Sequence, residues 1–109
     1  MKILTQKKFS EAARFLRKKG FKNNFVLADK KLRCIESEKE YDPSDMTIVL
    51  HRRFQRGNGP GSVVALFALH CTDSTKGLVK VLYGSHADWN MIGFLERVKV
   101  QLSPNPTLE

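Results

Sequence analysis

A stretch of arginines and glycines, HRRFQRGNGPGS at positions 51–62, has the residue types that bind phosphate in many loops. Arginine side chains and backbone amides can both donate hydrogen bonds to an anion. A phosphate cradle also needs a helix directly after the glycines, whereas the residues that follow, VVALFALHC, predict a strand. The glycine spacing matches neither GxGxxG nor GxxxxGK(S/T), and Pro60 has no amide hydrogen to donate. We therefore interpret the stretch as a hairpin turn beside an anion-attracting patch.

Basic side chains on three predicted strands, together with one arginine of the loop, form the candidate anion-binding set. The set is Arg33, Arg52, Arg53, Arg56 and Lys80. Strand alternation over residues 47–54 turns Leu50 and Phe54 to the core and Arg53 to the opposite face. The same alternation in the neighbouring strands brings Arg33 and Lys80 to the face of Arg53. We expect these side chains to lie on an open sheet face that no helix covers.

The net charge of +8 is concentrated near the N-terminus, where residues 1–23 carry eight Lys or Arg and one acid. A basic surface favours polyanions because binding releases their condensed counterions, so nucleic acid is an alternative ligand. Opposite the apolar stripe of the first predicted helix lie cations such as Arg14 and Lys18, which we interpret as a solvated face. Single-strand binders also expose aromatic rings for base stacking, and here we expect the phenylalanines to lie inside.

Three histidines and two cysteines are the residues that a metal site or a nucleophile would use. Cys34 and Cys71 lack the CxxC spacing of zinc and redox sites, so we predict no metal and no cofactor. His70 is the sequence neighbour of Cys71 and points to the opposite face of its strand, away from that thiol. We predict two buried, reduced thiols and no catalytic residue.

The turn YGSHADWN at 83–90 leads from a strand into a helix, where free backbone amides can bind an anion. Tyr83, Ser85 and His86 are the candidate side chains for a small ligand there. The alternative is that Asp88 caps the helix and its carboxylate fills that place. A small-molecule enzyme that uses this turn is therefore an alternative function.

Three residues fall on the side of the last predicted helix away from its apolar stripe: Trp89, Gly93 and Val100. A tryptophan in such a place indicates a partner surface, so these residues are a candidate homodimer patch. The alternative is that Trp89 folds over Ile3 and Leu4.

Apolar spacing, caps and alternation predict a helix, five strands and a second helix. The first helix has Ser10 as N-cap and ends at Gly20, with Phe21 contacting Leu16. The strands cover residues 24–29, 32–37, 47–54, 62–71 and 78–84. The last helix runs from Asp88 to Leu102, with an inward stripe of Met91, Phe94, Leu95, Val98 and Leu102. This order predicts an α+β fold in which a five-stranded, mainly antiparallel sheet carries both helices on one face.

The chain of 109 residues has room for one domain, which we place at residues 1–107. We interpret Leu108 and Glu109 as a cloning remnant. The start of the chain lacks the apolar run of a signal peptide, and the longest apolar run, Val63 to Leu69, is too short for a membrane span. These observations predict a cytoplasmic protein without a membrane partner.

Several segments are shared with a known group of proteins: the helix end LRKKGF, the strand pair NFVLADKKLRCIE, the turn YDPSD, the strand VVALFAL and KGLVKVLYGSHAD. With them the chain resembles a family of small bacterial proteins often labelled phosphoribosylpyrophosphate synthetase or hypothetical. The resemblance covers most of the chain and implies a common fold. The enzyme label would require a TGGT-type loop for ribose phosphate and a second domain, and this sequence has neither. The resemblance therefore supplies no catalytic residues, and His51, Arg52 and Arg56 depart from the more acidic family pattern.

Taken together, the residues predict a non-catalytic binding or accessory module with a basic, anion-binding sheet face. A nucleic-acid-binding protein and a small-molecule enzyme acting at the 83–88 turn are the alternatives. A homodimer is a possible assembly.

Overall fold

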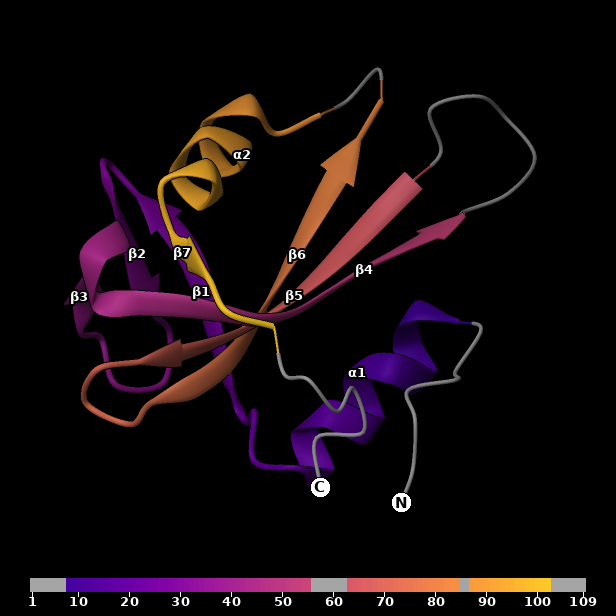
Figure 1. Ribbon diagram of the computed structural model, residues 1–109, viewed down its shortest axis with the longest axis horizontal. Helices are drawn as coiled ribbons and strands as arrows, with labels where there is room; N and C mark the ends of the chain where they lie inside the picture. The colour runs from indigo at the N-terminus through magenta and orange to yellow at the C-terminus, as the bar shows by residue number, and fades with distance from the viewer. Residues whose placement is uncertain (1–7, 56–62, 85–86, 103–109) are drawn as a thin grey trace.

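The computed structural model describes residues 8–55, 63–84 and 87–102 of the chain. This part forms two α-helices, one short 3-10 helix and seven strands (Figure 1). In chain order they are α1 (Phe9–Lys18), β1 (Asn23–Ala28), β2 (Lys31–Cys34), β3 (Glu40–Tyr41), η1 (Pro43–Asp45), β4 (Met46–Gln55), β5 (Val63–Cys71), β6 (Lys76–Tyr83), α2 (Trp89–Glu96) and β7 (Lys99–Val100).

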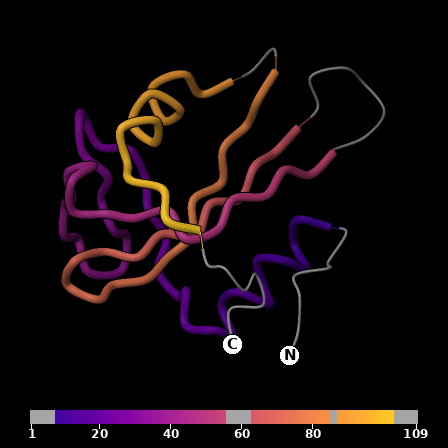
Figure 2. Tube along the Cα trace, in the orientation of Figure 1, coloured from indigo at the N-terminus to yellow at the C-terminus, as the bar shows by residue number. Residues whose placement is uncertain are grey.

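The strands form one curled, mixed sheet in the order β3-β2-β1-β6-β5-β4-β7. Its centre is an antiparallel meander of the three longest strands, β4, β5 and β6, which run side by side in Figure 2. β1 and β2 form a hairpin with a two-residue turn. β1 joins the meander by a short parallel pairing with β6, and β7 pairs in parallel with β4 at the other edge. The sheet therefore consists of a meander extended on both sides.

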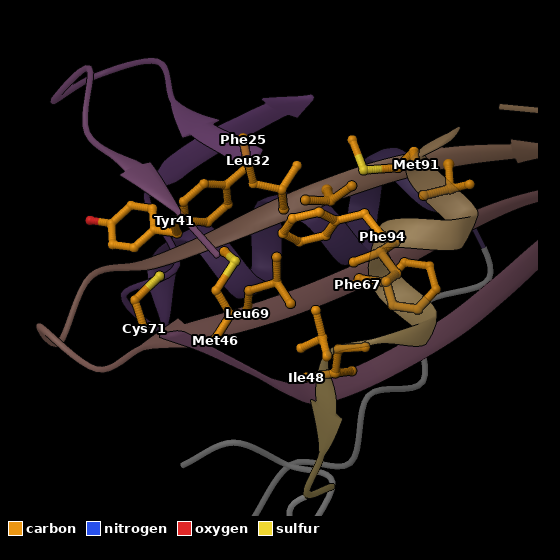
Figure 3. Close-up of a cluster of buried hydrophobic side chains, with 14 of the residues drawn as sticks. Phe25, Leu32, Tyr41, Met46, Ile48, Phe67, Leu69, Cys71, Met91 and Phe94 are labelled. Atoms are coloured by element: carbon orange, nitrogen blue, oxygen red, sulfur yellow. The ribbon is translucent and has the colours of Figure 1, made fainter. Parts of the chain in front are cut away.

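The central strand β5 is apolar on both faces, so each face needs its own cover. On one face, which we call the α1 side, α1 packs against Val64, Leu66 and Ala68 of β5 and against neighbours on β4 and β6. On the other face, the α2 side, the sheet curls around α2 (Figure 1). Figure 3 shows the cluster on that side, where Phe67 and Leu69 of β5 share a core with Met91 and Phe94 of α2.

The predicted five-stranded sheet with both helices on one face is wrong. The helices lie on opposite faces, because a doubly buried central strand cannot leave one face open to water. The sheet also has two further strands, β3 and β7, each of two residues. Strands this short contain no alternation for a sequence pattern to reveal. The sheet is mixed rather than mainly antiparallel, because β1 pairs in parallel with β6 and β7 pairs in parallel with β4.

The end of α1 follows the predicted pattern. Gly20 adopts a positive φ of 106°, its amide donates to the carbonyl of Arg17, and the amide of Phe21 donates to the carbonyl of Leu16. These two bonds define a Schellman ending, and the side chains of Leu16 and Phe21 are both buried in the α1-side core. The predicted N-cap is wrong, because the helix begins at Phe9 with Lys8 in the cap position and without a side-chain cap.

The second helix is shorter than predicted. α2 begins after Asp88, and the Asp88 side chain caps it, as one of the two alternatives for this turn predicted. The helix ends at Glu96 rather than at Leu102. The β-branched residues Val98 and Val100 favour extended backbone, and the edge of β4 offers partners for it. The amide of Gln101 accordingly donates to the carbonyl of Ile48. Leu102, predicted to face the core, has 54% of its surface exposed.

A β-bulge interrupts β4 at Val49. The register opposite β5 runs from Ile48 directly to Leu50, so Val49 is the extra residue. One extra residue moves every later side chain to the other face. Met46 and Ile48 consequently point to the α2 side, whereas Leu50 and Phe54 point to the α1 side.

Gly77 permits the close contact between β1 and β6. It lies opposite Asn23 in their short parallel pairing. A Cβ atom at this position would lie 2.5 Å from the carbonyl oxygen of Asn23 and 2.6 Å from the ring of Phe25. The absence of a side chain is therefore required for the β1–β2–β3 part of the sheet to join the meander.

We predict that Gly77→Ala lowers the free energy of unfolding by about 1 to 3 kcal/mol, because backbone and a buried ring must shift to admit the methyl group. The matched control is Gly93→Ala in α2, where a Cβ atom would meet nothing within 4 Å. That change should raise stability by up to about 1 kcal/mol, since alanine favours helix over glycine. Urea unfolding of both variants measures this. Equal stability of the two variants would contradict the role given to Gly77.

Candidate anion-binding site

Two of the predicted anion-binding residues lie on the same face of the sheet, the α1 side. Arg52 lies opposite Leu66 in the β4–β5 pair, and Leu66 lies opposite Lys80 in the β5–β6 pair. Residues opposite each other in an antiparallel pair point to the same face. Arg52 and Lys80 therefore project on the α1 side, one on each flank of β5.

The start of α1 lies between these two cations. Phe9 meets Phe54 edge to face with 5.8 Å between ring centroids. The guanidinium of Arg52 lies 5.0 Å from the Phe54 ring centroid, and the ammonium of Lys80 lies 6.0 Å from that of Phe9. Both distances are within the range of cation–π attraction. The aromatic pair thus separates Arg52 from Lys80 and holds each in place.

Arg53 does not join them, and the expected common face of Arg33, Arg53 and Lys80 does not form. The bulge at Val49 sends Arg53 to the α2 side, where its guanidinium lies 5.1 Å from the ring centroid of Tyr83. Uninterrupted alternation would place Leu50 on the same face as Ile48, whereas the bulge places the two on opposite faces. The alternation of apolar and polar residues in this strand does not show where a bulge adds a residue, so the sequence pattern could not predict it.

Arg33 is held by a carboxylate. Its Nη2 lies 2.7 Å from an oxygen of Glu38, and both side chains are exposed. Such an exposed pair contributes little stability, but it places a negative charge beside the guanidinium. Arg56 lies outside the described residues. The candidate anion-binding residues are therefore not together: Arg52 and Lys80 lie on the α1 side, Arg53 lies on the α2 side, and Arg33 forms an ion pair.

Basic residues of α1 and its C-terminal turn provide a larger positive surface than the predicted set. Residues 8–22 carry six Lys or Arg and one acid, Glu11. Four of these cations are exposed: Lys8, Arg14, Lys18 and Lys22. Lys19 lies 5.4 Å from the ring centroid of Phe15, and Lys76 of β6 lies 5.6 Å from that of Phe21. The α1 side is therefore basic, with aromatic rings between its cations.

Arg17 is fixed by a chain of hydrogen bonds that the sequence did not reveal. Its Nη2 donates to the side-chain oxygen of Asn24 at 2.6 Å. The Asn24 side chain and backbone amide in turn donate to the two oxygens of Glu36, at 2.7 and 2.8 Å. The Asn24 backbone amide is the first of the hydrogen bonds that lower the pKa of Glu36. A neutral amide therefore stands between the arginine and the carboxylate.

The acidic residues gather in a different part of the molecule. Residues 36–45 carry five acids and one lysine, on the β2–β3 hairpin and the turn before β4. In Figure 1 this part lies at the left, and α1 lies at the lower right. Asp73, in the β5–β6 turn, accepts from the Thr75 amide and from the Tyr41 hydroxyl, and these bonds lower its pKa to about 2. The charge of the chain is thus separated into a basic and an acidic region.

The predicted small-ligand turn is occupied at its helix end. The Asp88 side chain accepts a hydrogen bond of 3.1 Å from the amide of Met91, so it caps α2. Tyr83 is engaged by Arg53, whereas Ser85 and His86 lie outside the described residues. The described part of this turn therefore favours the capping alternative.

The cysteines are buried, and His51 is stacked on an aromatic ring. Cys34 and Cys71 are free and buried, and burial raises the pKa of the Cys71 thiol to about 12. No group of three or more His, Cys, Asp or Glu in residues 8–55, 63–84 and 87–102 is placed to hold a metal ion. His51 instead stacks on Phe67, with 4.2 Å between ring centroids and 8° between the ring planes.

The candidate homodimer patch is at the surface in part. Trp89 and Val100 have 72% and 59% of their surface exposed, and the space beside Gly93 is open. Whether a second chain covers them stays a prediction. Ile3 and Leu4, the alternative partners of Trp89, lie outside the described residues, as does the predicted cloning remnant at 108–109.

No family model, curated protein or solved structure matches this chain. No helix of the described residues is long and apolar enough to cross a bilayer. The case for a function therefore depends on the residues and their arrangement.

We predict that His51 makes stability fall as the pH drops through 6.5. Loss of hydration against Phe67, and then the charge of Arg53, lower its pKa in the folded chain from the ordinary 6.5. The unfolded chain thus takes up the proton first, and the free energy of unfolding decreases below that pH. His51→Phe retains the stacked ring and removes the titration. Urea unfolding above and below pH 6.5 should show a weaker pH dependence for the variant, and an unchanged dependence would contradict this role.

Proposed function

We propose that this protein is a non-catalytic binding module that holds single-stranded nucleic acid on the exposed surface of α1. The observation that carries this proposal is the separation of charge. Residues 8–22 carry the exposed cations, whereas the acids of residues 36–45 lie on the β2–β3 hairpin and the turn before β4, and Glu36 is linked to α1 through the neutral Asn24. A surface of this kind attracts phosphates and releases their counterions on binding.

The cations on the outer face of α1 have a spacing that suits a phosphate backbone. Arg14 and Lys18 are one helical turn apart, and both are exposed to solvent. Glu11 is the one acid on the described helix. The structure describes no carboxylate within ion-pair distance of Arg14 or Lys18, so their charges are available to a ligand.

Aromatic rings among these cations favour a single strand over a duplex. Phe9 and Phe15 are half-buried on α1, and each has a lysine close to its ring. Partly exposed rings between cations are the combination that stacks on unpaired bases while the cations bind phosphates. A duplex keeps its bases stacked on each other and gains nothing from these rings.

The groups that a reaction would use are otherwise occupied in the described part of the chain. The Cys71 thiol is buried with a raised pKa, and Asp88 caps α2. Arg53 and His51 are stacked on Tyr83 and Phe67. These arrangements support binding rather than catalysis.

We predict that Arg14→Ala with Lys18→Ala weakens binding of a labelled single-stranded oligonucleotide. The slope of log affinity against log salt should become shallower by about 0.7 for each phosphate that the variant no longer neutralises. Fluorescence anisotropy over a range of salt concentrations measures both the affinity and the slope. Both residues are exposed, so stability should change by no more than about 0.5 kcal/mol.

The matched control is Lys30→Ala with Lys99→Ala, which removes the same charge from the β1–β2 turn and from β7. It should leave the slope unchanged. Binding that does not respond to salt, or an equal effect of the two double variants, would contradict the proposal. Heparin bound as tightly as the oligonucleotide would show that the surface does not distinguish nucleic acid from other polyanions.

A further inference from the structure

A groove runs between α1 and the sheet, beneath the helix rather than on its outer face. It has a volume of about 250 Å³ and is lined by Phe9, Ala13, Arg17, Asn24, Leu66, Leu78 and Lys80. A second hollow of about 310 Å³ continues past Phe9 and Lys80 toward Ser10 and Val64. The groove therefore opens along the junction of α1 with β5 and β6.

The groove exists because α1 faces the sheet with a short side chain at this point. Ala13 lines the helix wall, and Leu66 and Leu78 form the sheet wall. The two leucines, which are 1% and 4% exposed, form its apolar floor. A larger side chain at position 13 would occupy the space directly.

Two cations line this apolar space. Arg17 is held by Asn24, and the hydrogen bonds shown for its guanidinium end on neutral oxygens, those of the Asn24 side chain and the Lys22 backbone. Lys80 lies beside the ring of Phe9. Within residues 8–55, 63–84 and 87–102, neither cation forms an ion pair with a carboxylate. The Glu36 carboxylate lies one amide away from Arg17, on the far side of Asn24, so neither cation has a direct carboxylate partner among these residues.

Apolar walls with these two cations are complementary to a small molecule with an apolar body and one anionic group. Burial of the body against Leu66 and Leu78 removes apolar surface from water, and a carboxylate can accept hydrogen bonds from the remaining donors of Arg17. A cation would be repelled, and a neutral apolar molecule would leave both charges unpaired. The volume limits the body to a short chain or a single ring system.

We propose that this groove binds a small free carboxylate with an apolar body, of the size of a medium-chain fatty acid, with its head group between Arg17 and Lys80. This site shares Phe9 with the surface proposed for nucleic acid but uses different cations. The groove lies under α1 and contains Ala13, whereas Arg14 and Lys18 lie on the exposed face of the helix.

Octanoate is the probe, with octanol and octylammonium as neutral and cationic analogues of the same chain length. Methyl NMR should show that octanoate shifts the signals of Ala13, Leu66 and Leu78. The methyl signals of Leu32 and Leu69, in the core on the α2 side, should not move. Octanol should bind at least tenfold more weakly, and octylammonium should not bind.

Three variants separate the apolar and the charged parts of the site. Ala13→Leu should abolish octanoate binding by filling the groove while both cations remain, and Ala13→Ser, of similar size, should retain it. Lys80→Met keeps most of the side-chain volume and should weaken octanoate about tenfold. Urea unfolding of each variant verifies that the domain is folded. Where a variant does not fold, the wild-type protein is used instead, and octanoate should displace a fluorescent aryl sulfonate from it.

Four results would overturn the proposal. They are equal affinity for octanol and octanoate, octanoate binding that persists in Ala13→Leu, methyl shifts confined to the α2-side core, and binding to anionic lipid vesicles without binding to free octanoate. The last result would assign the groove to a lipid surface. Ala13→Leu should leave the salt slope for the oligonucleotide unchanged, and Arg14→Ala with Lys18→Ala should change octanoate affinity less than twofold, so the two proposals fail independently.

Discussion

The burial of β5 on both faces is the constraint on which the rest of this structure depends. Its inward residues on one side pack under α1, and those on the other side pack under α2. Neither helix can be moved to the other face without exposing half of the strand to water. The curl of the sheet around α2 follows from covering this one strand.

The faces of the sheet acquire their different chemistry through β4. Its bulge at Val49 divides the strand into a first part that supplies the α2-side core and a second part that supplies the α1-side core. Adjacent strand residues point to opposite faces, and the bulge decides that Arg52 joins α1 whereas Arg53 joins Tyr83. The extra residue Val49 therefore decides which cations lie on the α1 side.

The two faces of α1 carry different residues and have different roles. Its apolar stripe closes the core through Ala12 and Leu16, and its outer face carries the exposed cations. Short alanine side chains allow the helix to contact the sheet and still leave the groove beside Arg17 and Lys80. The acids that would neutralise these cations are placed on the β2–β3 hairpin and its neighbouring turns, and Asn24 separates Arg17 from Glu36.

The sequence by itself determined the features that depend on neighbouring residues. These are the Schellman ending at Gly20, the β1–β2 hairpin, the Asp88 cap and the meander of apolar strands. Only the tertiary structure decided the parallel contact at Gly77, the two-residue edge strands, the faces of the two helices and the chain of bonds that fixes Arg17. Caps and turns are set by hydrogen bonds within a few residues. Pairings between distant strands depend on which elements bury each face of the sheet. A shift of one residue in register also moves every later side chain of the strand to the other face.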